Sequence, residues 1–191
     1  MAKNPRYRYV DDYETVPYVG ANGRSKEKVR YIGSYYWYAG EKKAVQKTLV
    51  LLHVLAYVTA ILTIAPLFFR HSAFLTLYVA VIHVVSLFPA LYLLMGSFRL
   101  PWQQKAQRRD EFDKGFRRIR RSAMAIFVIL GLTLVGETVF WCLNRVPFTG
   151  WDGLFLGCLV LSMASCYLIY KVEKGISVEQ KPNDFVPQKI F

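Results

Sequence analysis

The chain contains four long runs of uncharged and mostly apolar residues, separated by polar segments. The runs cover residues 48–69, 72–96, 122–143 and 153–170, and only Glu137 interrupts them. A helix needs roughly 20 apolar residues to cross the hydrocarbon core of a bilayer, and about 17–25 are tolerated. Each run meets this length. The pattern therefore predicts an all-α membrane protein, a four-transmembrane-helix bundle built from two antiparallel hairpins.

The polar segments divide the chain into five parts. We expect a basic, tyrosine-rich head (1–44), a first transmembrane hairpin (45–98), a basic amphipathic loop (99–121), a second transmembrane hairpin (122–172) and a tail (173–191). Within the first hairpin, Pro89 lacks the N–H group that a helix interior needs, so it is expected to kink the second helix.

The 25 lysines and arginines all lie outside the apolar runs. Ten fall in residues 3–47, nine in 99–121 and four in 171–189, whereas the other two connections contain only Arg70 and Arg145. Loops rich in lysine and arginine are retained in the cytoplasm. We therefore expect a multi-pass membrane protein whose two termini and central loop are cytoplasmic.

The head contains eight of the thirteen tyrosines of the chain and favours extended structure. Residues 6–10, 15–19 and 28–38 are rich in Tyr and Val, which is typical of strands. Asn22 and Gly23, between the last two of these segments, form a tight-turn signal. The head is expected to form a small β-hairpin or a three-stranded flap. Because so few strands are marginally stable alone, it should lean on the membrane surface or on a partner.

The central loop combines positive charge with an apolar stripe. Phe112, Phe116 and Ile119 recur at helical spacing, which predicts an amphipathic helix over residues 103–121 that lies on the inner leaflet and continues into the third span. Basic residues near a membrane are attracted to anionic lipids by about 1 kcal/mol each. The residues assigned to this role are Arg108, Arg109, Arg117, Arg118, Arg120 and Arg121. A nucleic-acid partner is not expected.

Glu137 is the only acidic residue inside a predicted span and lies in its outer half. A carboxyl group in a bilayer is costly, so Glu137 is either a functional proton or cation site or a neutral group hydrogen-bonded to a neighbouring helix. His83, near mid-membrane, is a candidate partner, whereas His53 in the inner half is too far for direct contact. A satisfied packing role is the alternative for both histidines.

The last span carries a pattern of small residues. Gly153 and Gly157 form a GxxxG motif, and Cys158, Ser162 and Cys166 follow at intervals of four. Small residues allow helix backbones to approach closely. We expect these five residues to pack the fourth helix inside the bundle, with a dimer interface as the alternative.

The sequence contains no pattern typical of catalysis or cofactor binding. Cys142 lies at the end of a predicted span, and Cys158 and Cys166 lie within one. Three such thiols give neither a disulfide framework nor the spacing of metal ligands. Neither an H-E-x-x-H motif nor a Ser-His-Asp order is present. We therefore expect a non-enzymatic protein without a metal or cofactor.

Two functions fit this sequence. The first is an accessory, anchoring or assembly subunit whose head docks on a protein partner or on a second copy of the chain. The alternative is a small transporter or channel component with Glu137 as its ion or proton site. The two differ in one structural property, which is whether Glu137 faces the bundle, with polar residues from other helices converging on it, or faces lipid.

Overall fold

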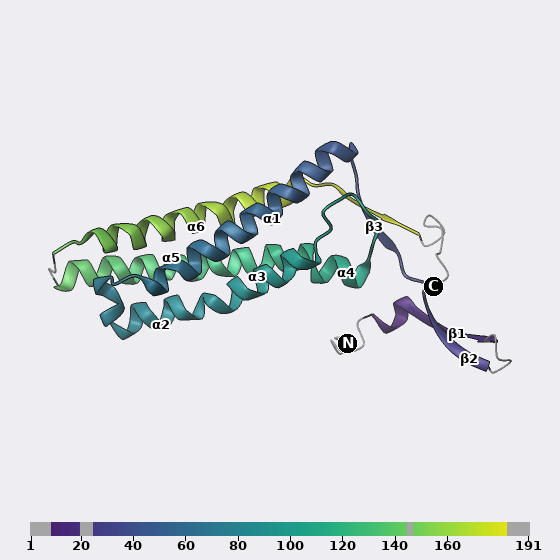
Figure 1. Ribbon diagram of the computed structural model, residues 1–191, viewed down its shortest axis with the longest axis horizontal. Coiled ribbons are helices and arrows are strands. Elements are labelled where there is room, and N and C mark those ends of the chain that lie inside the picture. Colours follow the sequence, from purple (N-terminus) through teal and green to yellow (C-terminus); the bar gives the residue numbers. More distant parts are fainter. Residues whose placement is uncertain (1–8, 20–24, 145–146, 183–191) are drawn as a thin grey trace.

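The computed structural model describes residues 9–19, 25–144 and 147–182, and its main feature is an elongated bundle of long helices (Figure 1). Among the described residues, four helical segments are long and apolar enough to cross a membrane. They are Lys42–Phe68, Leu77–Arg99, Arg109–Asn144 and Gly150–Lys174. Each of these segments overlaps one of the four apolar runs of the sequence.

The first hairpin has an uninterrupted outgoing helix and a divided returning helix. Its elements are α1 (Lys42–Ile64), the 3-10 helices η3 (Ala65–Phe68) and η4 (Ser72–Leu75), α2 (Leu77–Val85) and α3 (Leu87–Arg99). The division between α2 and α3 lies one turn before Pro89, whose nitrogen has no hydrogen to donate to the carbonyl of Val85. The interruption expected from Pro89 is therefore present.

The second hairpin consists of two long helices and a short one before them. Its elements are α4 (Arg109–Lys114), α5 (Phe116–Asn144) and α6 (Gly150–Lys174). The helix expected over residues 103–121 begins only at Arg109, because Gln107–Arg108 form strand β4. Gly115 separates α4 from α5 at a close approach, since a β-carbon there would lie 3.2 Å from the carbonyl oxygen of Arg99.

The long helices enclose an apolar core and also present an apolar outer surface. α1 packs against α6 and α3, and α5 packs against α3 and α6. Fully buried core residues include Leu49, Leu52, Leu93, Ile126, Leu130 and Ile169. Many outward-facing side chains are also apolar, for example Ile61, Phe88, Val135 and Leu161. Helices that are hydrophobic all round are typical of membrane spans.

All three basic segments meet at one end of the bundle. Strand β3 (Tyr35–Tyr38) of the head pairs antiparallel with β4 on one side and with β5 (Val178–Lys181) on the other. Head, central loop and tail therefore lie at the same end, which is the arrangement that the charge distribution predicts.

The head also contains the expected β-hairpin. Strands β1 (Tyr13–Val19) and β2 (Ser25–Tyr31) pair antiparallel, and the hairpin extends beyond the end of the bundle (Figure 1). The turn predicted at Asn22 and Gly23 lies outside the described residues. The existence and the strand order of the hairpin thus agree with the sequence pattern.

The base of the head is held by the central loop of the same chain. The hydroxyl of Tyr9 donates a hydrogen bond to Asp113 (2.9 Å), and that of Tyr13 donates to Asp110 (3.2 Å). The buried hydroxyl of Tyr38 donates to Oε1 of Gln107 at 2.7 Å. These bonds join the head to α4 and β4.

The apolar stripe of the central loop faces protein, which corrects the expectation that it lies on lipid. Phe112, Phe116 and Ile119 are at most 5% exposed. The ring of Tyr36 stacks on that of Phe112 with a centroid distance of 4.6 Å, and Tyr38 contacts Phe116 at 5.8 Å. The apolar face exists as the pattern predicts, but Tyr36 and Tyr38 of the head cover Phe112 and Phe116, and Ile119 lies beside Gly96 of α3.

Candidate functional site

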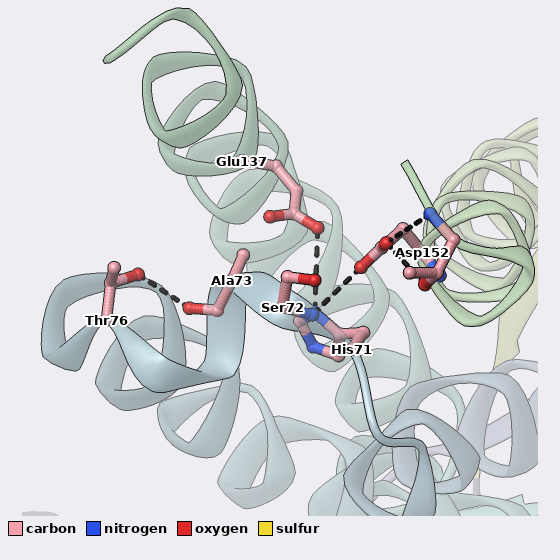
Figure 2. Close-up of polar contacts among 7 residues, drawn as sticks. His71, Ser72, Ala73, Thr76, Glu137 and Asp152 are labelled. Carbon is pink, nitrogen blue, oxygen red and sulfur yellow. Dashed lines mark hydrogen bonds and ion pairs between the residues drawn. The ribbon is translucent and has the colours of Figure 1, made fainter. Parts of the chain in front are cut away.

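Three titratable side chains lie close together (Figure 2). They belong to the end of the bundle where α2 begins, opposite the sheet (Figure 1). His71 comes from the connection between η3 and η4, Glu137 from α5 and Asp152 from the first turn of α6. Their exposed fractions are 4%, 0% and 0%. We refer to these three side chains as the polar cluster.

Helix α5 turns Glu137 into the bundle. The buried positions of this helix include Leu130, Thr133, Glu137 and Phe140, and their intervals of three and four define one helix face. Because Glu137 belongs to this face, its carboxyl group points into the protein. The structure therefore places Glu137 toward the interior of the bundle and away from its outer surface.

Asp152 is fixed by hydrogen bonds at the start of α6. Its Oδ2 accepts from the backbone N–H of Thr149 at 2.8 Å and from the Thr149 hydroxyl. Its Oδ1 accepts from the backbone N–H of Ser72 at 2.9 Å. The Thr149 hydroxyl also accepts from the N–H of Asp152, which completes a capping box. One carboxylate thus starts α6 and ties it to η4.

His71 and Glu137 form a close acid–base pair. The Nδ1 atom of His71 lies 3.7 Å from Oε1 of Glu137 (Figure 2), which is longer than a hydrogen bond. Both ring nitrogens of His71 and both carboxyl oxygens of Glu137 are buried without a hydrogen-bond partner among the described residues. Most buried polar atoms in proteins have a hydrogen-bond partner, so each exception calls for an explanation. The two atoms would form a hydrogen bond, along which a proton can pass, at a separation of about 2.7–3.2 Å.

Aromatic rings enclose the imidazole of His71. The ring stacks on Phe155 with a centroid distance of 3.8 Å and contacts Phe74 at 3.9 Å. Burial lowers the pKa of His71 to about 4, the charge of Asp152 opposes this shift, and His83 adds to it. At neutral pH the imidazole is therefore uncharged.

The two histidines singled out in the sequence do not contact Glu137 in the described structure. The Nε2 of His83 donates to the carbonyl of Thr63 at 3.1 Å. His53 donates from Nδ1 to the carbonyl of Leu49 at 2.8 Å and stacks on Trp102. Packing and local hydrogen bonding thus account for His53, and His83 lies near the cluster with Phe155 beside it.

Sequence reasoning missed His71 and Asp152. His71 sits in a short connection between two spans, where an exposed turn is the ordinary expectation. Asp152 did leave a signal, because Thr149 followed by an acid three residues later is a capping pattern. No local signal shows that the His71 connection folds inward, since that depends on how the two hairpins pack.

The small residues of α6 lie on two different faces, which corrects the expectation that they pack together inside the bundle. Gly153 and Gly157 are exposed, and a β-carbon on Gly157 would meet no atom within 4 Å. Ser162 and Cys166 are buried, and the Ser162 hydroxyl lies 3.0 Å from that of Thr63 on α1. Cys158 is half-buried. A β-carbon on Gly153 would lie 3.5 Å from the ring of Phe148, so within the described residues only Gly157 of the GxxxG motif is without a close neighbour. A role of the motif in a dimer stays a prediction.

The six arginines assigned to lipid contact several groups of their own chain. Ion pairs join Arg109 to Asp12 (3.7 Å), Arg117 to Asp113 (2.9 Å) and Arg120 to Glu173 (3.4 Å). Arg108 lies over the ring of Tyr31 and Arg118 over that of Tyr92. Arg121 is exposed. Lipid contact by these residues stays a prediction.

Within the described residues, no group of three or more His, Cys, Asp or Glu side chains is arranged to hold a metal ion. The polar cluster can therefore be described as an acid–base pair with an anchored carboxylate beside it. Comparison with known proteins gives no match to a family model, to a curated protein or to a solved structure.

Proposed function

We propose that this chain is a multi-pass membrane protein, a small transporter or channel component, and that the polar cluster is its proton-binding site. Among the two functions that fit the sequence, this alternative draws more support from the geometry. The observation that carries the proposal is the buried pair of Glu137 and His71, 3.7 Å apart.

The convergence of titratable groups supports this proposal. Ionisable residues inside membrane spans are rare and face the interior of the bundle, where they mark proton or ion pathways. Here His71, Glu137 and Asp152 come from three separate elements and are buried side by side. The capping box accounts for Asp152, so the argument rests on the burial of His71 beside Glu137.

The unpaired atoms argue against a purely structural role for Glu137. A structural carboxyl group in a span is expected to hydrogen-bond to a neighbouring helix. Both oxygens of Glu137 lack such a partner among the described residues. A neutral imidazole next to it is a proton acceptor rather than a fixed positive charge.

The proposed orientation places the polar cluster near the outer face and the sheet in the cytoplasm. The positive-inside rule supports it, because all three basic segments meet at the sheet end. Thiol labelling tests it in a background without the three native cysteines. A cysteine at Asn144 should react with an impermeant reagent from outside, and one at Gln103 should not, both positions being exposed. The reverse pattern would overturn the orientation.

Proton flux into vesicles tests the proton site. The purified chain is reconstituted into vesicles that contain a pH-sensitive dye, and a pH gradient is imposed. Glu137→Gln keeps the shape and hydrogen-bonding capacity of the side chain but removes its titration. It should abolish the flux, whereas Glu179→Gln, the same change at an exposed position of β5, should leave it intact. Equal flux in Glu137→Gln and the parent chain would contradict the proposal.

A docking subunit is the second candidate, and the hairpin of the head favours it. Within the described residues, β1 and β2 pair only with each other, so each strand has an open edge. Val29 on β2 is 65% exposed, and Ile32, which follows β2, is 43% exposed. An open strand edge can accept a strand from a partner. Removal of residues 9–31 should then abolish partner capture and leave proton flux unchanged.

A further inference from the structure

A cavity of about 300 Å³ lies at the basic end of the bundle, where Tyr9 of the head meets α3, α4 and α5. Four basic side chains line it, together with one acid, Asp113. The four are Lys114, Arg117, Arg118 and Arg121. Four positive charges against one negative charge leave a net positive lining, which favours an anionic ligand.

Two of the four basic residues are already paired with acids. Arg117 forms an ion pair with Asp113 at 2.9 Å, and Lys114 forms one with Asp110 at 3.3 Å. Arg118 and Arg121 have no carboxylate within ion-pair distance in the described part of the chain. The guanidinium of Arg118 lies over the ring of Tyr92, 5.4 Å from its centroid, which holds it at the wall of the cavity.

The cavity lies at the level where the third span begins. Ser122, which also lines it, starts the uncharged run of α5. Tyr92 lines it from α3, and tyrosines are enriched at the membrane–water interface. Phe88, one turn further into the span on the same face of α3, is 67% exposed. The polar lining of the cavity therefore adjoins an exposed apolar surface of α3.

We propose that this cavity binds the phosphate group of an anionic phospholipid from the cytoplasmic leaflet. Arg118 and Arg121 would hold the phosphate oxygens, because guanidinium groups bind phosphate through paired hydrogen bonds. The acyl chains would follow the apolar surface of α3 at Phe88. Basic pockets between spans on the cytoplasmic side are suited to such head groups. This inference uses the membrane orientation and does not depend on the proton site.

Lipid association measured with spin-labelled phosphatidylglycerol tests the proposal. The full chain is reconstituted in phosphatidylcholine vesicles, and the immobilised fraction of the labelled lipid is compared with that of labelled phosphatidylcholine. The pocket variant is Arg118→Gln/Arg121→Gln. The matched control is Lys42→Gln/Lys43→Gln, which removes the same charge from exposed residues at the start of α1, at the same end of the bundle.

The pocket variant should lose selective association by more than tenfold, because loss of one hydrogen bond between charged groups weakens binding by about tenfold or more. The control should change by less than about twofold, since exposed charges are screened by salt. Equal losses in both variants would overturn the proposal in favour of general surface attraction. Displacement of the labelled lipid by excess inorganic phosphate would overturn it in favour of a free anion. If the double variant fails to fold, Arg121→Gln alone, at an exposed position, takes its place. Its selective association with the labelled lipid should fall by about tenfold.

Discussion

The imidazole of His71 lies 3.7 Å from the carboxyl group of Glu137, although one residue belongs to a connection between spans and the other to a long helix. The connection reaches the interior because η3 and η4 shape it into two tight turns. Asp152 then anchors it through the N–H of Ser72. The tie between the two hairpins therefore creates the acid–base pair.

Acid should destabilise the fold through His71. Its pKa is about 4 in the folded chain, against an ordinary value of 6.5. Between these two values the unfolded chain binds a proton that the folded chain does not, so stability falls as the pH drops from about 6.5 toward 4. The loss should reach at most about 3 kcal/mol. Thermal unfolding in detergent at a series of pH values measures it.

His71→Asn is the control for this pH dependence, because it retains a hydrogen-bonding group near Nδ1 and removes the titration. The groups facing His71 remain in both proteins: Glu137 on α5, Asp152 on α6 and His83 on α2. The difference in stability between parent and variant should shrink with acid. A difference that stays constant from pH 7 to 4, the interval set by these pKa values, would show that His71 does not contribute.

Asp152→Ala should weaken the connection between the hairpins. The substitution removes the acceptor for Thr149 and Ser72 and leaves α6 without its capping box. Loss of such a cap costs about 0.5–2 kcal/mol of stability, and the half-buried N–H of Ser72 also loses its acceptor. The thermal midpoint should fall, and proton flux should fall with it because His71 loses its anchor. An unchanged midpoint would mean that the capping box is dispensable.

Tyr38→Phe should loosen the head from the bundle. The hydroxyl of Tyr38 is buried and bonds to Gln107 at 2.7 Å, so its removal leaves a buried amide oxygen without that donor. The stability of the contact between the head and the bundle should fall by about 1–3 kcal/mol. Limited proteolysis of the head should become faster. Tyr36→Phe retains the stack on Phe112 and should not change the cleavage rate; equal acceleration in both variants would contradict this account.

Gly96→Ala should destabilise the contact between α3 and α5. A β-carbon on Gly96 would lie 3.0 Å from Cγ1 and 3.2 Å from the backbone nitrogen of Ile119. Such overpacking costs about 1–3 kcal/mol. Gly157→Ala, at an open position of α6, should be neutral or slightly stabilising, because Ala favours a helix over Gly by about 1 kcal/mol. The midpoint of thermal unfolding should therefore fall in Gly96→Ala and stay unchanged or rise slightly in Gly157→Ala.

The long elements were predictable because each depends on local sequence alone. Four apolar runs specify four helices, Pro89 specifies an interruption, and a strand–turn–strand pattern specifies the hairpin. The side chains that these elements bring together were not predictable in the same way. Phe112 was assigned to lipid because a helix face shows that it is apolar but not what covers it.

The candidate site was predictable only in part, for the same reason. Glu137 stood out because a charged group in an apolar run is costly wherever it points. His71 did not stand out, since a histidine in a short turn is ordinary until the turn is buried. Depth along the span points to His83 as the partner of Glu137, but the packing of α2, α5 and α6 brings His71 to it instead.

The central claim is that the carboxyl group of Glu137 binds and releases a proton beside His71. Infrared difference spectroscopy of the chain in lipid nanodiscs measures this directly, because a protonated carboxylic acid has a carbonyl band that the carboxylate lacks. The account predicts a carbonyl band that changes with pH in the parent chain and is missing from Glu137→Gln, while Glu179→Gln retains it. An identical pH-dependent spectrum in Glu137→Gln and the parent chain would contradict the assignment of the proton to Glu137.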